Sequence, residues 1–409
     1  MRSATDRRVG AVAWSEASNP LALTDLEVAA GDLTSPGRSV QLSTPPTGGP
    51  VEVLERLLVG ALAQPPCCLA FSGGRDSSAL LALAAGVARR EGLPRPVALT
   101  TRWPGDVLSE ESAWQEHVVS SVGVEDWEII YPGDQLDLLG PVATAVLTDQ
   151  GLLWPPPSYV LYPLMQRAAG GTLVTGEGGD EVFGLWAHAS TWESLRKRKW
   201  PGARSLGALG VAILPSRARE LLCRNSVSAY QDWLLPDAKA MYERQLAAAF
   251  AQDAPQWPRY LAQILGSRDL ALAAATRSAM SARARTTYQA PFLEAPFLSA
   301  MGKVGGHYGI GNRSMVMRRT FGGILPDNVL TRVSKATFGD VFWGKESRDF
   351  ARTWDGEGVD RELVDVDKLR RAWLADRPVF GCALALHAAW LVTNTETVPS
   401  RPSLAQPNP

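Results

Sequence analysis

Residues 67–78 read Cys-Cys-Leu-Ala-Phe-Ser-Gly-Gly-Arg-Asp-Ser-Ser, and this stretch decides the fold. The pattern predicts an apolar strand, a tight turn of two glycines, and a helix whose apolar residues lie mainly along one side. A glycine turn at a helix N-terminus presents backbone N–H groups to an anion, and the helix dipole favours the same charge. Ser72 and Ser77 add hydroxyl donors, whereas Asp76 suits such a site only when a cation accompanies the anion. The stretch therefore predicts a site for a nucleotide polyphosphate with Mg²⁺.

The composition limits the class of protein. A chain of 409 residues allows two or three domains, and 20% charged with 45% hydrophobic residues is the mixture of a soluble globular protein. The net charge of −1 creates no overall field that favours nucleic acid or an acidic membrane. No apolar run approaches the roughly 20 residues of a membrane helix, and residues 1–10 lack the apolar core of a signal peptide. We therefore expect a cytoplasmic protein without nucleic-acid or membrane partners.

Strands alternate with helices through the first half of the chain. After the opening stretch, β-rich runs occur at residues 97–101, 127–131 and 172–175, with helical patterns between them. This alternation predicts an α/β fold: a parallel sheet with helices on both faces, in which ligands bind beyond the carboxyl ends of the strands. From about residue 190 the strand signals fade and helical patterns dominate, as over residues 260–280.

The expected organisation has three parts. Residues 1–50 contain several prolines and glycines with weak periodicity, which indicates a variable N-terminal segment. Residues 51–392 form the main domain, made of an α/β nucleotide-binding core (51–190) and a mostly helical half (191–392). The remaining residues, 393–409, are rich in Pro, Ser and Asn and are expected to be a flexible tail.

A second glycine loop follows the run at 172–175. Residues 176–184 read Gly-Glu-Gly-Gly-Asp-Glu-Val-Phe-Gly, so this loop is rich in carboxylates. If the strands before the two loops are neighbours, the loops face each other across the end of the sheet. Asp76 and Asp180 can then share one Mg²⁺.

These two loops resemble those of a known family. Ser72-Gly73-Gly74-Arg75-Asp76-Ser77 resembles the SGGxDS pyrophosphate loop of the ATP pyrophosphatase superfamily, and no Gly-Lys-Ser/Thr follows as in a P-loop. The second loop resembles the GEG-[AS]-DE-[LV]-F-G signature of asparagine synthetases. Ser109-Glu110, the run 290–294, the run 317–326 and Arg332 with Lys335 agree in order with further motifs of that family. The resemblance covers about residues 51–345 and implies the HUP-like α/β fold of ATP pyrophosphatases.

The resemblance also implies a role for each matching residue. Loop one would hold the pyrophosphate of ATP, Asp76 and Asp180 would bind Mg²⁺, Glu177 would be the general base or proton shuttle, and Lys335 would stabilise the oxyanion and the α-phosphate. The positions that contact the nucleotide in the family are Phe71, Ser72, Gly73, Gly74, Asp76, Ser77, Thr101, Thr175 and Gly176. Taken alone, the aspartates also suit helix N-caps, and Glu177 also suits a structural carboxylate that holds its loop in place. Lys335, Arg318 and Arg332 also suit surface charges, and Tyr288 suits an aromatic core as well as a pocket wall.

The sequence also departs from asparagine synthetases. Glutamine-dependent members begin with a glutaminase domain whose nucleophile is an N-terminal cysteine, whereas here residue 2 is Arg and the first cysteine is Cys67. We therefore expect an amine that does not come from glutamine. Residues 286–289 replace the usual GVEAR lead-in near the amino-acid substrate, so free aspartate is not the expected substrate.

Two branches of the superfamily use an amine that is already present: β-lactam synthetases and lasso-peptide macrolactam synthetases. The Gly-Gly-Asp-Glu form of loop two and the spacing of Arg332 and Lys335 are more similar to the lasso branch, and β-lactam synthetases carry Tyr at the position of Glu177. Lasso-type enzymes usually keep a longer N-terminal domain, which counts against this assignment. The lasso branch implies a precursor peptide, a leader-binding protein and a protease as partners.

The function expected from the sequence is an ATP-dependent, AMP-forming amide or lactam synthetase. It would adenylate a carboxylate and couple it to an amine, by macrolactam formation on a ribosomal peptide or in a specialised metabolite. Three alternatives stay open: ammonia-dependent asparagine synthesis, ring closure of the β-lactam type, and a catalytically inactive ATP-binding scaffold.

Overall fold

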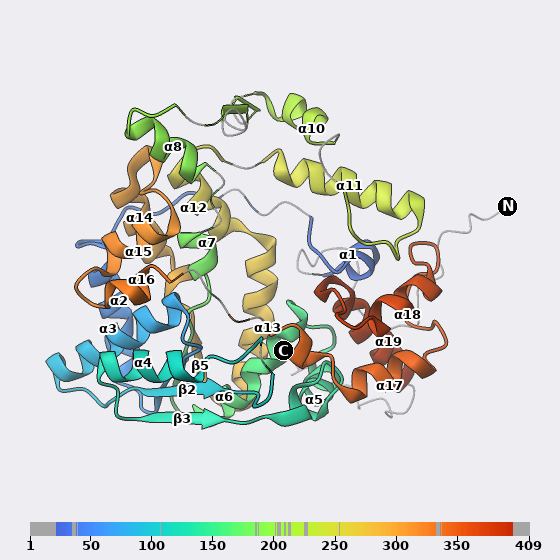
Figure 1. Cartoon of the computed structure of the whole chain (residues 1–409), viewed down its shortest axis with the longest axis horizontal. Helices are drawn as coiled ribbons and strands as arrows, with labels where there is room; N and C mark the ends of the chain where they lie inside the picture. The colour runs from blue at the N-terminus through green and yellow to red at the C-terminus, as the bar shows by residue number, and fades with distance from the viewer. Residues whose placement is uncertain are drawn as a thin grey trace, which may run out of the picture.

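A computed structural model gives the fold (Figure 1). It describes residues 22–395, apart from residues 35–37, 39, 107, 185, 187, 201, 203–205, 208, 209, 212, 213, 225–227, 253, 333–335 and 337.

The centre of the structure is a five-stranded sheet in which every pair of neighbouring strands is parallel. Its order is β3-β2-β1-β4-β5, with the strands β1 (Cys67–Ala70), β2 (Val97–Thr101), β3 (Trp127–Ile130), β4 (Thr172–Val174) and β5 (Thr287–Gln289). The predicted parallel sheet is therefore confirmed, and the strands that precede the two glycine loops, β1 and β4, are direct neighbours. The short strand β5 was not predicted, because it has only three residues and lies inside a region of helical pattern.

Side chains alternate between the two faces of the sheet, and each face has its own core. Cys68, Leu99 and Leu173 pack with helices α5 (Pro141–Gln150) and α6 (Tyr162–Arg167). Residues on the other face, such as Leu69 and Val174, pack with helices α2 (Pro50–Leu62) and α3 (Arg75–Glu91). The helices therefore cover both faces, as the nearly continuous apolar strands require.

The second half of the chain is mostly helical, as predicted. Its elements are α7 (Gly179–Phe183), α8 (Ala189–Arg196), α10 (Ser216–Arg224), α11 (Pro236–Phe250), α12 (Trp257–Gly266), α13 (Arg268–Ala284), α14 (Ala295–Gly305), α15 (Arg313–Phe321), α16 (Asp327–Leu330), α17 (Lys345–Thr353), α18 (Val366–Leu374) and α19 (Ala383–Thr395). None of the described helices is long and apolar enough to cross a membrane.

The run predicted as one helix over residues 260–280 is two helices, α12 and α13. Ser267 lies between them with extended backbone, and its hydroxyl caps α13 by accepting a hydrogen bond from the Leu270 N–H at 3.5 Å. The apolar pattern continues on both sides of this residue, so periodicity alone does not reveal the break.

The segment before the sheet contains a short packed helix, α1 (Asp25–Ala30). Its Leu26 and Ala30 belong to the same core as Leu386 of α19. The carboxylate of Glu27 is only 2% exposed and forms an ion pair with Arg268 at 2.5 Å, at the start of α13. Helix α1 therefore connects the C-terminal helices to the centre of the molecule.

His387 of α19 makes stability depend on pH. The side chain is fully buried, its Nε2 lies 3.0 Å from the Leu138 carbonyl oxygen, and burial lowers the pKa of His387 from 6.5 to about 4. The unfolded chain takes up this proton first, so stability that is present above pH 6.5 is lost as the pH falls to about 4. At 1.36 kcal/mol for each pKa unit, the loss is about 3 kcal/mol.

We expect the variant His387→Gln to lose less stability than the wild type between pH 6.5 and pH 4, as measured by urea unfolding at each pH. His117 is exposed, so His117→Gln is the matched control and should retain the wild-type pH dependence. An unchanged pH dependence in His387→Gln would show that this imidazole does not determine the acid sensitivity.

Candidate active site

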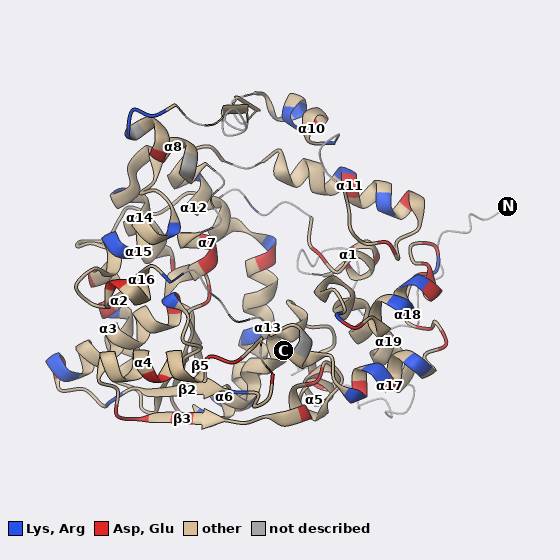
Figure 2. Ribbon diagram, in the orientation of Figure 1, with Lys and Arg blue, Asp and Glu red and all other residues tan. Residues whose placement is uncertain are grey.

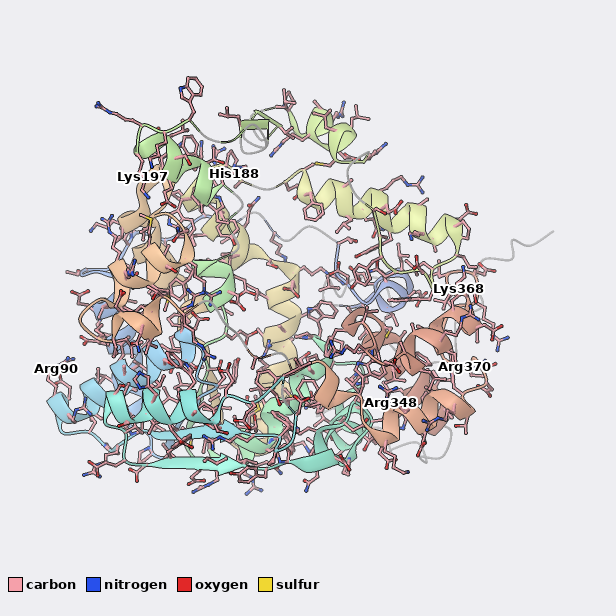
Figure 3. The ribbon with its side chains drawn as sticks, in the orientation of Figure 1. Arg90, His188, Lys197, Arg348, Lys368 and Arg370 are labelled. Atoms are coloured by element: carbon pink, nitrogen blue, oxygen red, sulfur yellow. The ribbon has the colours of Figure 1, made fainter. Side chains whose placement is uncertain are left out.

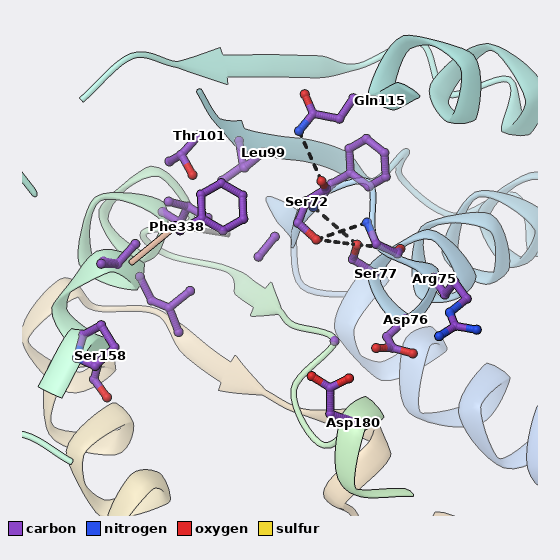
Figure 4. A pocket seen from close by; sticks show the side chains of 18 of the residues that line it. Ser72, Arg75, Asp76, Ser77, Leu99, Thr101, Gln115, Ser158, Asp180 and Phe338 are labelled. Carbon is purple, nitrogen blue, oxygen red and sulfur yellow. Dashed lines mark hydrogen bonds between the residues drawn. The ribbon is translucent and has the colours of Figure 1, made fainter. Parts of the chain in front are cut away.

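A cavity of about 520 Å³ opens at the carboxyl end of the sheet, where β1, β2 and β4 end (Figure 4). One part is polar and consists of the two glycine loops with the cationic side chains around them. The other part is apolar. Its lining includes Ala70, Phe71, Leu99, Trp103, Pro155, Pro157, Val160, Leu161, Leu164, Phe338 and Phe342. The cavity therefore lies where ligands bind in open parallel sheets.

The turn of loop one is held from outside by α4 (Ser112–Val122). Gly73 has a φ of +84°, a backbone conformation that favours glycine. The indole of Trp114 donates a hydrogen bond to the Gly73 carbonyl at 2.9 Å, and the side-chain amide of Gln115 donates to the Ser72 carbonyl at 3.2 Å. Helix α3 then begins at Arg75 without a side-chain cap on its N-terminal N–H groups. Those N–H groups therefore remain available to an anion.

The two glycine loops touch each other. A Cβ on Gly176 would lie 3.0 Å from the Ser77 nitrogen, and a Cβ on Gly179 would lie 2.3 Å from Cγ of Asp76. A side chain at position 179 would displace Asp76, and one at position 176 would leave the Ser77 backbone very little room. The expectation that the loops face each other is therefore correct, and it follows from the pairing of β1 with β4.

Asp76 and Asp180 approach each other in this contact, and Arg313 lies between them. The Arg313 guanidinium is 2.5 Å from Oδ2 of Asp76 and also pairs with the Asp180 carboxylate. Oδ1 of Asp76 is buried and has no hydrogen-bond partner, and burial raises the pKa of Asp76 against the opposing effect of Arg313. An unpartnered buried carboxylate oxygen beside a second carboxylate fits a cation.

No group of three or more His, Cys, Asp or Glu side chains in the described part of the chain is arranged to hold a metal ion. An ion at the two aspartates would therefore need further oxygen ligands. Mg²⁺ commonly takes one or two carboxylates together with substrate phosphates. The donor set thus fits Mg²⁺ that arrives with a nucleotide.

Glu177 is held in a second polar cluster at the edge of the cavity. Oε1 of Glu177 is 2.7 Å from the Arg277 guanidinium, and Oε2 accepts a hydrogen bond from the Tyr288 hydroxyl. The Tyr288 oxygen is also 2.9 Å from the Thr175 hydroxyl. Burial, together with the Glu177 carboxylate, raises the pKa of Tyr288, so Tyr288 stays protonated as a donor. Tyr288 therefore packs against the hydrophobic core with its ring and places its hydroxyl in this polar cluster, and it is not among the residues that line the cavity.

The two arginines of the C-terminal motif have different surroundings. Arg332 lines the cavity, forms two hydrogen bonds with Glu111 at 2.9 and 2.6 Å, and lies over the ring of Trp114. Arg318 is exposed and pairs with Asp327 on the surface. Lys335, the predicted oxyanion stabiliser, lies outside the described residues.

The cavity brings together most of the residues expected from the sequence. The predicted residues in its lining are Phe71, Ser72, Gly74, Asp76, Ser77, Thr101, Gly176 and Asp180. Gly73, Thr175 and Glu177 are not in the lining, and their contacts support it instead.

Sequence reasoning missed Arg277, Arg313, Glu111 and Gln115. Arg277 had a usable signal, because it lies on the same side of α13 as the buried residues Ala273, Met280 and Ala284, where an unpaired charge is costly.

A parallel α/β sheet that brings two touching glycine loops to one cavity at its carboxyl end is an arrangement typical of nucleotide-binding folds. Within this class, the chain belongs to the asparagine synthase family, because the family model described as asparagine synthase matches residues 54–396. The members of this family are ligases that use ATP to form amide bonds. A comparison with curated proteins finds no match.

Proposed function

We propose that the protein is an AMP-forming amide synthetase that adenylates a carboxylate and joins it to an amine from a source other than glutamine. The observation that carries this proposal is the contact between the two loops. It places Asp76, Asp180 and the start of α3 on one side of the cavity, with the Glu177 cluster at its edge.

In the first step, a carboxylate oxygen of the substrate attacks the α-phosphorus of ATP. The bond from that phosphorus to the oxygen that bridges it to the β-phosphate breaks, and pyrophosphate leaves with the negative charge. The N–H groups at the start of α3, together with Arg75 and Arg313, are positioned to neutralise it. Mg²⁺, when bound at Asp76 and Asp180, would supply further positive charge to the phosphates.

In the second step, the amine attacks the acyl carbon, and AMP leaves. The attacking nitrogen must lose a proton, and we assign Glu177 as the acceptor. Arg277 and Tyr288 each engage one carboxylate oxygen of Glu177, so this side chain is fixed in orientation before the substrate arrives. Lys335 remains the proposed oxyanion stabiliser.

The apolar part of the cavity supports a substrate larger than free aspartate. Trp103, Phe338 and Phe342 offer no charge to the ammonium and second carboxylate of aspartate, whereas they suit the adenine ring and the side chains of a peptide. We therefore propose macrolactam formation, in which a side-chain carboxylate joins the N-terminal amine of the same peptide. A precursor peptide, a leader-binding protein and a protease are the proposed partners.

Three of the four described cysteines are buried, and they are poor candidates for a nucleophile that would release ammonia from glutamine; the fourth, Cys223 of α10, is half-buried and is not among the residues that line the cavity. Burial raises the pKa of Cys67 to about 12, of Cys68 to about 11 and of Cys382 to about 12. A buried thiol of this kind is not a nucleophile.

The test incubates purified protein with Mg²⁺, ATP and linear peptides that have a free N-terminal amine and an internal Asp or Glu. We expect AMP, pyrophosphate and a peptide that has lost one water. Aspartate with ammonium serves as the second substrate pair. ADP among the products would contradict the adenylation step. Asparagine formation without turnover of the peptides would show that aspartate, and not a peptide, is the substrate.

A further inference from the structure

The segment between α8 and α11 concentrates positive charge. Residues 195–224 contain eight Lys or Arg residues and one acidic residue, Glu220, although the whole chain has a net charge of −1. Two of these cations are paired on the surface, Lys197 with Glu193 at 2.5 Å and Arg224 with Glu220 at 2.6 Å. Lys197, Lys199 and Arg217 are exposed. Figure 2 shows basic residues at the end of α8 and along α10, on the edge of the molecule that lies opposite the sheet in this view. The net charge of the whole chain is therefore close to zero even though this segment carries a local excess of positive charge.

Large apolar side chains stand on the same segment. Trp200 is 90% exposed, and Leu221 and Leu222 of α10 are 62% and 49% exposed. Leu206 and Leu214 are also exposed. Isolated exposed leucines are ordinary, but a tryptophan that is 90% exposed next to Lys197 and Lys199, with leucines along the same segment, is typical of a surface that contacts a partner.

We propose that this basic arm, made of the described residues of 195–224, binds the surface of an anionic lipid bilayer. The cations match the negative lipid headgroups, and attraction of this kind acts within about one Debye length of the membrane. Tryptophan prefers the boundary between headgroups and acyl chains, and leucines on a basic helix enter the same layer. The apolar groups protrude, which suits insertion into a soft interface.

The arm is separate from the ATP cavity, because none of the residues that line the cavity belongs to it. Binding to lipid therefore leaves the proposed reaction centre open. It would hold the synthetase at a membrane surface, although none of the helices in the described part of the chain can span a membrane. The expectation of no membrane partner came from the net charge and from the lack of a long apolar run, and the local charge of the arm departs from the first of these two grounds.

The test is co-sedimentation of the full chain with vesicles of phosphatidylcholine alone or mixed with phosphatidylglycerol. We expect binding to the anionic vesicles only, and weaker binding as salt is raised from about 0.05 to about 0.3 M. The double variant Lys197→Glu with Lys199→Glu should bind at least about fivefold more weakly for each replaced lysine. Trp200→Ser should also bind more weakly, and brominated lipid should quench less fluorescence in Trp200→Phe than in the wild type.

The matched control is Lys345→Glu with Lys368→Glu, which makes the same change in net charge on α17 and α18. Figure 3 labels Lys197 and Lys368 at well-separated edges of the molecule. This control should bind vesicles like the wild type. Equal loss in the control, equal binding to neutral vesicles, or binding to polyglutamate or DNA but not to vesicles would overturn the proposal.

Discussion

Asp76→Asn will reduce the exchange of labelled pyrophosphate into ATP by about a thousandfold, measured with the carboxylate substrate and saturating Mg²⁺. The substitution keeps the shape of the side chain but removes the charge beside Asp180 and the N-terminus of α3. Oδ1 of Asp76, which is buried and without a partner, becomes an atom of a neutral amide and is then a much poorer cation ligand. The substitution slows the first step, and amide formation also decreases because it requires the product of that step.

A measurement of thermal stability distinguishes a loss of catalysis in Asp76→Asn from a loss of structure. Burial already raises the pKa of Asp76, so a neutral amide at this position is not a large cost to the fold. We expect the melting temperature of Asp76→Asn to stay close to that of the wild type. Asp327→Asn is the matched control, because Asp327 also pairs with an arginine but lies on the surface. Exchange activity that survives in Asp76→Asn would exclude a metal held by this carboxylate.

Glu177→Gln will separate the two steps. Pyrophosphate exchange should stay within about a factor of two of the wild type, because the first step needs no proton acceptor at this position. Amide formation should fall by about 10²- to 10⁴-fold, the range attributed to a positioned general base. The glutamine side chain keeps the volume and can still hydrogen-bond to Arg277 or Tyr288, so the geometry of the cluster is largely retained.

Single-turnover experiments measure this difference, because the acyl-adenylate accumulates when only the second step is slow. Glu128→Gln is the control, since Glu128 forms an exposed ion pair with Arg167 on the far edge of the sheet. Tyr288→Phe should reduce amide formation less than Glu177→Gln does, because it removes one donor to the carboxylate and leaves Arg277. An equal decrease in pyrophosphate exchange and in amide formation in Glu177→Gln would show that this residue acts in adenylation or maintains the structure of the site.

Local patterns predicted the sheet because its strands are short apolar runs that end at glycine turns. Each of the four predicted strands exists, and the pairing of β1 with β4 explains why the two loops meet. The edge strand β5 carries Thr287, Tyr288 and Gln289 in a single short extension. It forms because the chain after α13 lies beside β4, and a three-residue sequence contains no sign of that proximity.

The site residues also fall into two groups: those that local patterns predict and those whose positions depend on the tertiary fold. Residues within the two loops were identified because their order along the chain fixes their positions at the ends of two strands. Arg313 and Arg277 come from α15 and α13, far away in sequence, and their positions depend on how these helices pack. The ion pairs of Arg313 with both aspartates and of Arg277 with Glu177 are therefore properties of the tertiary fold.

The packing of α1 against α19 has a consequence for synthesis on the ribosome. One core contains Leu26 from α1, Cys68 and Leu173 from the sheet, and Leu386 from α19. Contacts between the earliest and latest described helices are made only after almost the whole chain has emerged, and such long-range closure is slow. The outer part of this core, where α19 packs against α1 and α5, therefore stays open during translation, although α5 and α6 already cover this face of the sheet. The nascent protein should depend on chaperones until α19 is released.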